Sequence, residues 1–180
     1  MSRTGARSSR VAPGAAIRGL PPMLPADARV LILGSFPGVA SLAARQYYAH
    51  PRNHFWPIVG ELVGEPLVRL DYDRRLACLA SHGIALWDTI VACERRGSLD
   101  AAIRNAVRAE VARVRRAAPG LAVVAFNGNT AARAAPRWSE AGYATLVLPS
   151  TSPAYTRPFG EKLAAWRALS PWLPATGQNR

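Results

Sequence analysis

Cysteine is scarce in this sequence, and its scarcity limits the chemistry that the chain can perform. Cys78 and Cys93 are the two cysteines, too few for a four-thiolate zinc site or an iron–sulfur cluster. We expect both to be reduced, partly buried thiols. The cysteine pattern therefore predicts no resident metal.

Long apolar runs are also missing. No run approaches the roughly 20 residues that a membrane-spanning helix needs. The basic N-terminus lacks the apolar segment of a secretory signal peptide. We therefore predict no contact with a membrane and a cytoplasmic location.

The common cofactor and nucleophile motifs are absent as well. The sequence has no G-x-G-x-x-G, no G-x-x-x-x-G-K-[ST], no H-E-x-x-H and no G-x-S-x-G. His50 and His54 have helical i, i+4 spacing, but Pro51 between them argues against a shared helix face. We therefore expect no cofactor and no metal site.

Acidic residues are few, and this gives the chain a strong positive charge. Against 11 acidic residues stand 23 basic ones, so that the net charge is +12 and the isoelectric point is about 11.3. Lys162 is the only lysine. Such a field suits a polyanionic partner, although a solvated basic surface with no such partner is the alternative.

The length predicts one domain with a substantial core. Residues 1–26 hold four arginines among Ser, Gly and Pro, and we expect a mobile basic arm. A single domain is expected over residues 27–174, followed by a flexible tail over 175–180. Nothing in the sequence argues for an oligomer, so we expect a monomer.

The body of the chain alternates between apolar strands and helical patterns. Strands are predicted over residues 29–34, 83–88, 121–128 and 143–150. Helices are predicted over 53–64, 71–83, 129–135 and 160–169, and one long or two short helices over 98–120. Apolar strands separated by helices indicate an α/β fold with a parallel sheet covered on both faces.

In such sheets the ligand site lies beyond the carboxyl ends of the strands. Each unusual segment follows a predicted strand: residues 34–56, 88–100, 127–129 and 149–157. Four loops therefore converge on one rim of the sheet, where we expect an active site.

Four motifs together resemble the uracil-DNA glycosylase superfamily, and most closely its DNA-deoxyinosine (hypoxanthine-DNA) glycosylase family. They are GSFPGVAS…QYYAHPRNHFW, GIALWDTIVACERRGSLDAAI, AFNG and LPSTSPAYTR, in order along residues 28–172. The Y-A-H-P-x-N-x-F-W segment is similar to mismatch-specific uracil-DNA glycosylases too. The resemblance implies a three-layer α/β/α sandwich around a four-stranded parallel sheet.

The implied reaction is hydrolysis of the N-glycosidic bond of a deaminated base in double-stranded DNA, after the nucleotide is flipped out of the helix. Hypoxanthine is the first expected base and uracil the second. Lys162 is expected in the closing helix, too far away for Schiff-base chemistry, so we predict no strand cleavage. A catalytically idle DNA-binding module of the same fold, or a small-molecule enzyme, is the alternative.

The resemblance also assigns roles in the first loop. Phe36 stands where related enzymes hold a water-positioning Asn, and the turn Gly34–Phe36, with Ser35, is expected to border the base. The resemblance then assigns the positioning of the water to Asn53, whose carbonyl oxygen could orient a water toward the sugar. A helix N-cap is the structural alternative for Asn53.

Three further residues are assigned to the base. Tyr48 occupies the place of an aromatic that stacks on the flipped base, with an ordinary packed Tyr as the alternative. Asp88 stands where uracil enzymes carry a base-reading Asn. It could accept the lactam N–H, stabilise the cationic sugar, cap a helix or pair with an arginine. Asn127 is expected to line the pocket.

DNA contacts are expected from two loops. Ser150, Thr151 and Ser152 offer hydroxyl and N–H groups to phosphate, and Tyr155 is the expected strand wedge. The superfamily's usual His is replaced by Leu148. Further phosphate contacts are predicted at the positions Arg95, Arg96 and Ser98, for which a solvated loop is the alternative.

Overall fold

A computed structural model of the protein describes residues 16–174. The first 15 residues of the predicted arm and the predicted tail 175–180 lie outside the described residues. Among the described residues, no helix has the length and apolar character that crossing a bilayer requires.

The core of the molecule is a four-stranded parallel sheet. Its strands are β2 (Val30–Gly34), β3 (Ile84–Asp88), β6 (Val123–Asn127) and β7 (Ala144–Leu148). Their order is β3-β2-β6-β7, and all three pairings are parallel. Every residue of β2, β3 and β6 is buried, as their continuous apolar sequences predict.

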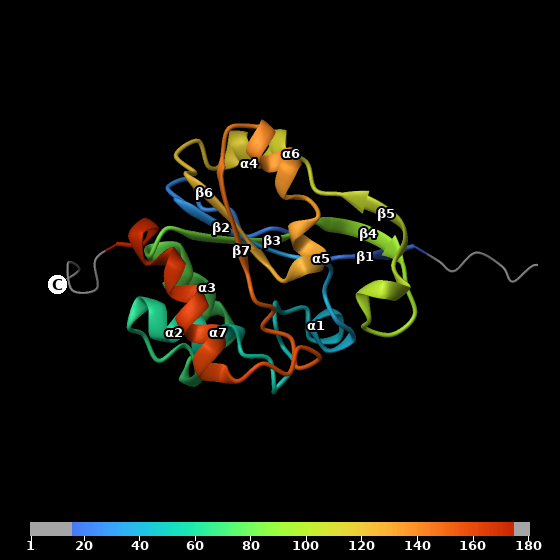
Figure 1. The fold of residues 1–180 in the computed structure, drawn as a ribbon, viewed down its shortest axis with the longest axis horizontal. Coiled ribbons are helices and arrows are strands. Elements are labelled where there is room, and N and C mark those ends of the chain that lie inside the picture. Colours follow the sequence, from blue (N-terminus) through green and yellow to red (C-terminus); the bar gives the residue numbers. More distant parts are fainter. Residues whose placement is uncertain (1–15, 175–180) are drawn as a thin grey trace, which may run out of the picture.

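Helices cover both faces of this sheet (Figure 1). Alternate strand residues such as Ile32 and Leu86 pack with α2 (Phe55–Val63), α3 (Tyr72–Ser81) and α7 (Phe159–Trp166). The intervening residues, such as Leu33 and Trp87, pack with α4 (Val111–Ala117), α5 (Asn129–Ala132) and α6 (Ala135–Glu140). The predicted three-layer α/β/α sandwich is therefore confirmed.

Local signals in the sequence place the helix ends. Asp71 precedes α3, and its carboxylate accepts the N–H of Arg74 at 2.9 Å, which caps the helix. Gly64 ends α2 in the left-handed conformation, with φ at 73°. Short elements complete the chain: α1 (Val39–Ala44), η1 (Leu67–Arg69), η2 (Asp100–Ala102) and η3 (Arg167–Trp172).

A second, smaller sheet was not expected. It joins β1 (Ile17–Arg18), β4 (Ile90–Glu94) and β5 (Arg104–Arg108) in the antiparallel order β1-β4-β5. The helix predicted over 98–120 is wrong in its first half, which forms η2 and β5, whereas α4 is helical. The apolar residues over 98–120 have helical spacing, but hydrogen bonding to β4 makes the short segment Arg104–Arg108 a strand.

The small sheet also corrects the predicted arm. Ile17 pairs with Cys93, Leu20 is buried, and Met23 bridges to Leu86 of the main sheet. These apolar residues attach the segment from Ile17 onward to the folded domain, so the boundary predicted at residue 26 lies too far along the chain.

Candidate active site

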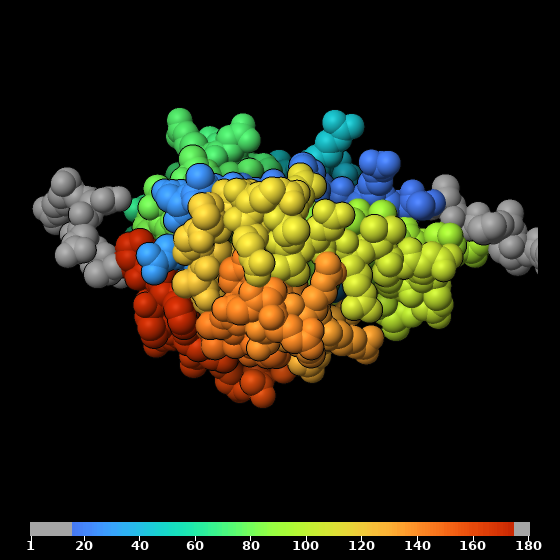
Figure 2. Space-filling model, turned by 90° about the horizontal axis from the view of Figure 1, so that it is seen from above, coloured from blue at the N-terminus to red at the C-terminus, as the bar shows by residue number. Residues whose placement is uncertain are grey.

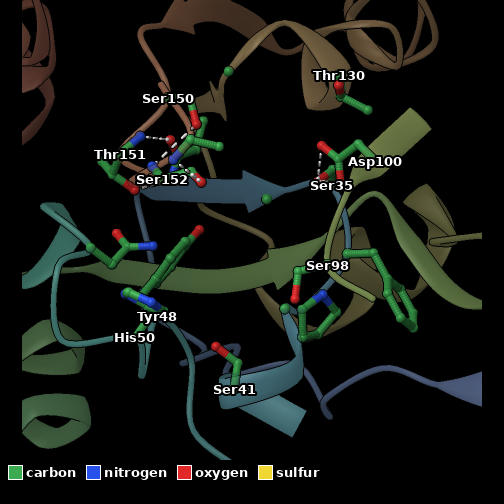
Figure 3. Close-up of a pocket in the computed structure, with 18 of the residues that line it drawn as sticks. Ser35, Ser41, Tyr48, His50, Ser98, Asp100, Thr130, Ser150, Thr151 and Ser152 are labelled. Atoms are coloured by element: carbon green, nitrogen blue, oxygen red, sulfur yellow. Dashed lines mark hydrogen bonds between the residues drawn. The ribbon is translucent and has the colours of Figure 1, made fainter. Parts of the chain in front are cut away.

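A cleft of about 440 Å³ opens at the carboxyl-end rim of the main sheet (Figure 3). The loops that follow all four parallel strands line it, as predicted. The predicted residues that border it are Gly34, Ser35, Phe36, Tyr48, Asn53, Asp88, Ser98, Asn127, Ser150, Thr151, Ser152 and Tyr155. Two of the predicted residues, Arg95 and Arg96, are not among its lining residues.

The floor of the cleft is formed where β2 and β3 end. Their register places Gly34 directly beside Asp88. A Cβ at position 34 would collide with Asp88 Oδ1 and would lie 3.3 Å from the Tyr48 hydroxyl. Glycine is therefore required here because it leaves room for these two polar side chains.

Asp88 carries a buried carboxyl group whose pKa is raised. Burial above all, together with the nearby charge of Asp100 and against the opposing charge of Arg95, raises its pKa from 3.8 to about 7. Asp88 Oδ2 and the Tyr48 hydroxyl are both buried without a hydrogen-bond partner. Unpartnered buried polar atoms are costly, so a polar ligand in the cleft would be stabilised by bonding to these two oxygens.

Tyr48 is held rigidly. Its ring stacks on Phe55 with a centroid separation of 3.8 Å and an interplanar angle of 16°. Its backbone is left-handed, with φ at 55°, which is uncommon for a residue with a side chain. One face of the ring is therefore already covered, and only the rest of it is left for a ligand.

Asn53 makes a local contact just before α2, whose N-cap position is occupied by His54. Its Oδ1 accepts the backbone N–H of Phe55 at 3.0 Å, at the start of α2. An amide oxygen has two lone pairs, and this bond uses one of them. Asn53 also lines the cleft, so this contact and the positioning of a water are compatible.

Asn127 ties the fourth loop to the end of β6. Its Nδ2 donates to Thr151 Oγ1, and its Oδ1 accepts the Thr151 N–H, both at 2.8 Å. Thr151 is fully buried, its N–H donates to Asn127, and its hydroxyl accepts from the same side chain. The prediction that Thr151 contacts phosphate is therefore wrong, because the residue anchors the loop instead.

The serines beside Thr151 shape the same loop. Ser150 Oγ accepts the N–H of Ser152, and Ser152 Oγ accepts the N–H of Ala154, both at 3.2 Å. Both serines are half-buried and border the cleft. Their contact with DNA stays a prediction.

Lys162, on α7, fastens the tip of this loop. It is 1% exposed, and its Nζ donates to the Tyr155 carbonyl at 2.6 Å and the Ser152 carbonyl at 3.4 Å. The ammonium group also lies 5.3 Å from the centre of the Tyr155 ring. Burial lowers the pKa of Lys162.

We expect Lys162→Met to loosen this loop. The carbonyls of Ser152 and Tyr155 would lose their donor, at a cost of about 1–3 kcal/mol in the free energy of unfolding. Thermal unfolding measures this loss. Glu161→Ala is the matched control, because Glu161 is also on α7 and its exposed pair with Arg157, which precedes the helix, should contribute less than about 1 kcal/mol. Equal effects of the two variants would contradict the role given to Lys162.

Arg95 is the second predicted site residue, after Thr151, whose assigned contact with phosphate the structure overturns. The side chain is 8% exposed, lies over the Phe36 ring at 4.8 Å and donates to the Pro37 carbonyl. It braces the first loop from inside and is not available to phosphate. Arg96, in contrast, is exposed, and its contact with phosphate stays a prediction.

The sequence analysis missed Asp100. Its carboxylate accepts the Ser35 hydroxyl, with both oxygens at 2.8 Å, and it borders the cleft. Figure 3 shows this contact between the first and second loops. The available signal was an acidic residue soon after the pair Arg95 and Arg96. Other lining residues that were missed include Ser41, His50, Asn129 and Thr130.

Acidic and imidazole groups do not gather into a metal site. Within residues 16–174, no group of three or more His, Cys, Asp or Glu side chains is arranged to hold an ion. The cleft presents amides, hydroxyls, the imidazole of His50 and the carboxyl groups of Asp88 and Asp100, a set suited to a polar organic ligand.

Comparison with known proteins identifies the class. The family profile of the Uracil DNA glycosylase superfamily matches residues 21–171. With its parallel sheet and the cleft at its rim, the chain belongs to this superfamily of DNA glycosylases.

More specific relatives agree with the resemblance seen in the motifs. A Hypoxanthine DNA glycosylase of Methanosarcina barkeri is 36% identical over 149 residues, covering 83% of this chain and 94% of that protein. One of Methanosarcina acetivorans is 36% identical over 152 residues, covering 84% and 96%. The solution NMR structure of a candidate uracil DNA glycosylase from M. acetivorans has a TM-score of 0.75 at 35% identity, covering 86% of this chain and 98% of that one.

Proposed function

We propose that this protein is a monofunctional DNA glycosylase that removes a deaminated base from duplex DNA, with hypoxanthine the first substrate and uracil the second. The observation that carries the proposal is the pair of unpartnered buried oxygens, Asp88 Oδ2 and the Tyr48 hydroxyl, on the floor of the cleft. The names of the two Methanosarcina relatives support hypoxanthine.

Asp88 reads the base in this proposal. A carboxyl group with a pKa of about 7 is substantially protonated near neutrality, and it then has one acceptor and one donor. Hypoxanthine and uracil each present a lactam edge, with an N–H beside a carbonyl. The neutral Asp88 accepts from that N–H and donates to that carbonyl, as an amide would.

Asn53 positions the water. The water oxygen forms a bond to C1′ as the bond between C1′ and the base nitrogen breaks. The electron pair leaves with the base, which takes up a proton, and an abasic site remains. Little proton abstraction is needed early, because departure of the base makes the sugar resemble an oxocarbenium ion; a neutral amide is therefore adequate.

Lys162 is the only lysine, and its amine is buried under the loop that it fastens. A lyase activity would need an amine that reaches C1′. We therefore propose that the enzyme leaves the DNA strand intact.

Labelled duplexes with one inosine, uracil, xanthine or mismatched thymine test the function. We expect strand breaks only after alkali, fastest with inosine. Borohydride should trap no enzyme–DNA adduct. Breaks without alkali would contradict a monofunctional enzyme, and binding without excision on every duplex would identify an idle DNA-binding module.

A further inference from the structure

One basic side chain lines the cleft, and it is the imidazole of His50. None of the arginines in the described part of the chain borders the cleft, and neither does Lys162. Figure 3 shows the half-buried ring of His50 in the cleft together with Tyr48. The roles given to Asp88 and Asn53 leave this imidazole without a task.

Arginines line a second recess instead. Its volume is about 290 Å³, and the exposed residues Arg104, Arg108 and Arg133 border it. It lies between β5, in the yellow-green segment of Figure 2, and the orange segment around α5. The other two histidines, His54 and His82, are not lining residues of the cleft either. The basic group in the cleft is thus an imidazole, which can be neutral near pH 7, and not a guanidinium, which cannot.

A hydrogen bond fixes which ring nitrogen of His50 carries the hydrogen. The backbone N–H of Arg52 donates to His50 Nδ1 at 3.1 Å, so Nδ1 is the acceptor and has no hydrogen of its own. In the neutral ring the hydrogen is therefore on Nε2. The ring nitrogen left to bind a ligand is thus an N–H donor.

The backbone is held on both sides of His50. The N–H of Ala49 donates to Ser41 Oγ at 3.2 Å, and the His50 carbonyl accepts the N–H of Asn53 at 2.8 Å. His50 and Asn53 therefore share one closed turn. Because Asn53 is assigned to the water that attacks C1′, this turn brings His50 to the side of the base that is next to the sugar. A donor held in this way needs little reorganisation during the reaction.

We propose that His50 Nε2–H donates a hydrogen bond to the flipped base beside the glycosidic bond and stabilises the negative charge that the base gains as this bond breaks. This inference rests on the proposed glycosylase function. Hypoxanthine offers N3 as the acceptor on that side, and uracil offers O2. The electron pair of the bond between C1′ and the base passes to the base, His50 keeps its proton, and the departing base takes its proton from solvent. A neutral imidazole suits this role, because it adds no positive charge beside the cationic sugar.

Two substitutions of similar size separate the donor from the local contact. Glutamine can place an N–H near the position of Nε2, whereas asparagine places its polar atoms near Nδ1 and can still accept the Arg52 N–H. Single-turnover excision of hypoxanthine should fall about a hundredfold in His50→Asn and stay within about tenfold of the wild-type rate in His50→Gln. His82→Asn is the matched control. It lies between α3 and β3, at the end of β3 opposite Asp88, and should keep the wild-type rate.

Binding and spectroscopy test the same role without turnover. A duplex with 2′-fluoro-2′-deoxyinosine, whose glycosidic bond resists hydrolysis, should bind His50→Asn less than about threefold more weakly than wild type, because the negative charge develops only as the bond breaks. Nitrogen NMR of the wild-type imidazoles, assigned by the signal lost in His50→Asn, should show Nε2 of His50 protonated and Nδ1 unprotonated.

The outcomes separate this inference from the function on which it rests. Equal rates for His50→Asn and His50→Gln, a loss of affinity as large as the loss of rate, or a proton on Nδ1 would each overturn the role of His50. If the wild type excises bases and His50→Asn matches it, the role of His50 fails and the glycosylase function stands. If the wild type binds the fluorinated duplex but excises no base, the glycosylase function itself fails.

Discussion

Asn53→Ser should lower the single-turnover rate of base excision by about a hundredfold or more while changing stability little. A serine hydroxyl can make the same local contact and replace the acceptor that Asn53 Oδ1 offers to the Phe55 N–H. Its shorter side chain has no amide with which to position the water. Rapid-quench assays with excess enzyme measure the rate, and thermal unfolding measures the stability.

Asn53→Ala is the matched variant. It removes both this acceptor and the amide, and it should lose the same activity together with about 1 kcal/mol of unfolding free energy. If Asn53→Ser excises hypoxanthine at the wild-type rate, Asn53 serves only as the acceptor of the Phe55 N–H. The water must then be held by another group in the cleft.

Excision by the wild-type enzyme should decline as the pH rises through about 7, the pKa of Asp88. Only the protonated carboxyl group can donate to the lactam carbonyl, so the rate should fall about tenfold per pH unit above that value. Asp88→Asn should keep much of the activity and lose this decline, because an amide offers a donor and an acceptor at every pH.

Asp100→Asn provides an independent check on this assignment. The charge of Asp100 helps to raise the pKa of Asp88, so removing it should move the decline to lower pH. A rate that instead rises through pH 7, and is lost in Asp88→Asn, would contradict base reading. That result would make the ionised carboxylate a stabiliser of the cationic sugar.

Asp88→Asn should also stabilise the fold in alkaline solution. The carboxyl group titrates at about 7 in the folded chain against an ordinary 3.8, so the folded state binds more protons between these values. Stability therefore falls as the pH rises through this window. The uncharged amide avoids this loss, and its advantage should grow to a few kcal/mol near pH 8, measured as a shift of the unfolding temperature.

The main sheet and its rim were predictable because their signals are local. Continuous apolar runs such as Val30–Gly34 and Val123–Asn127 identify buried parallel strands, and each is followed by an unusual loop. Parallel strands bring those loops to one edge whatever the details of their packing. Two roles could be predicted for Asn53, because a local contact with the backbone and the positioning of a water both use its amide oxygen.

The features that sequence reasoning missed depend on distant partners. Arg95 is in a charged segment typical of a solvated loop, and its burial depends on Phe36 and Pro37, far away in the chain. Strand β5 has exposed side chains throughout, so only its pairing with β4 marks it as a strand. Leu99 also lines the cleft without a local signal, because its neighbours Ser98 and Asp100 are bonded to Val39 and Ser35 in the first loop.

The burial of Lys162 has a consequence for the product of the proposed reaction. An abasic site carries an aldehyde in its open form, and primary amines condense with aldehydes readily. Arginine remains protonated and strongly delocalised, and it does not form such imines under these conditions. Nearly all the positive charge of this protein is carried by arginine. In the proposed reaction, the protein would therefore bind the reactive product without forming a covalent bond to it.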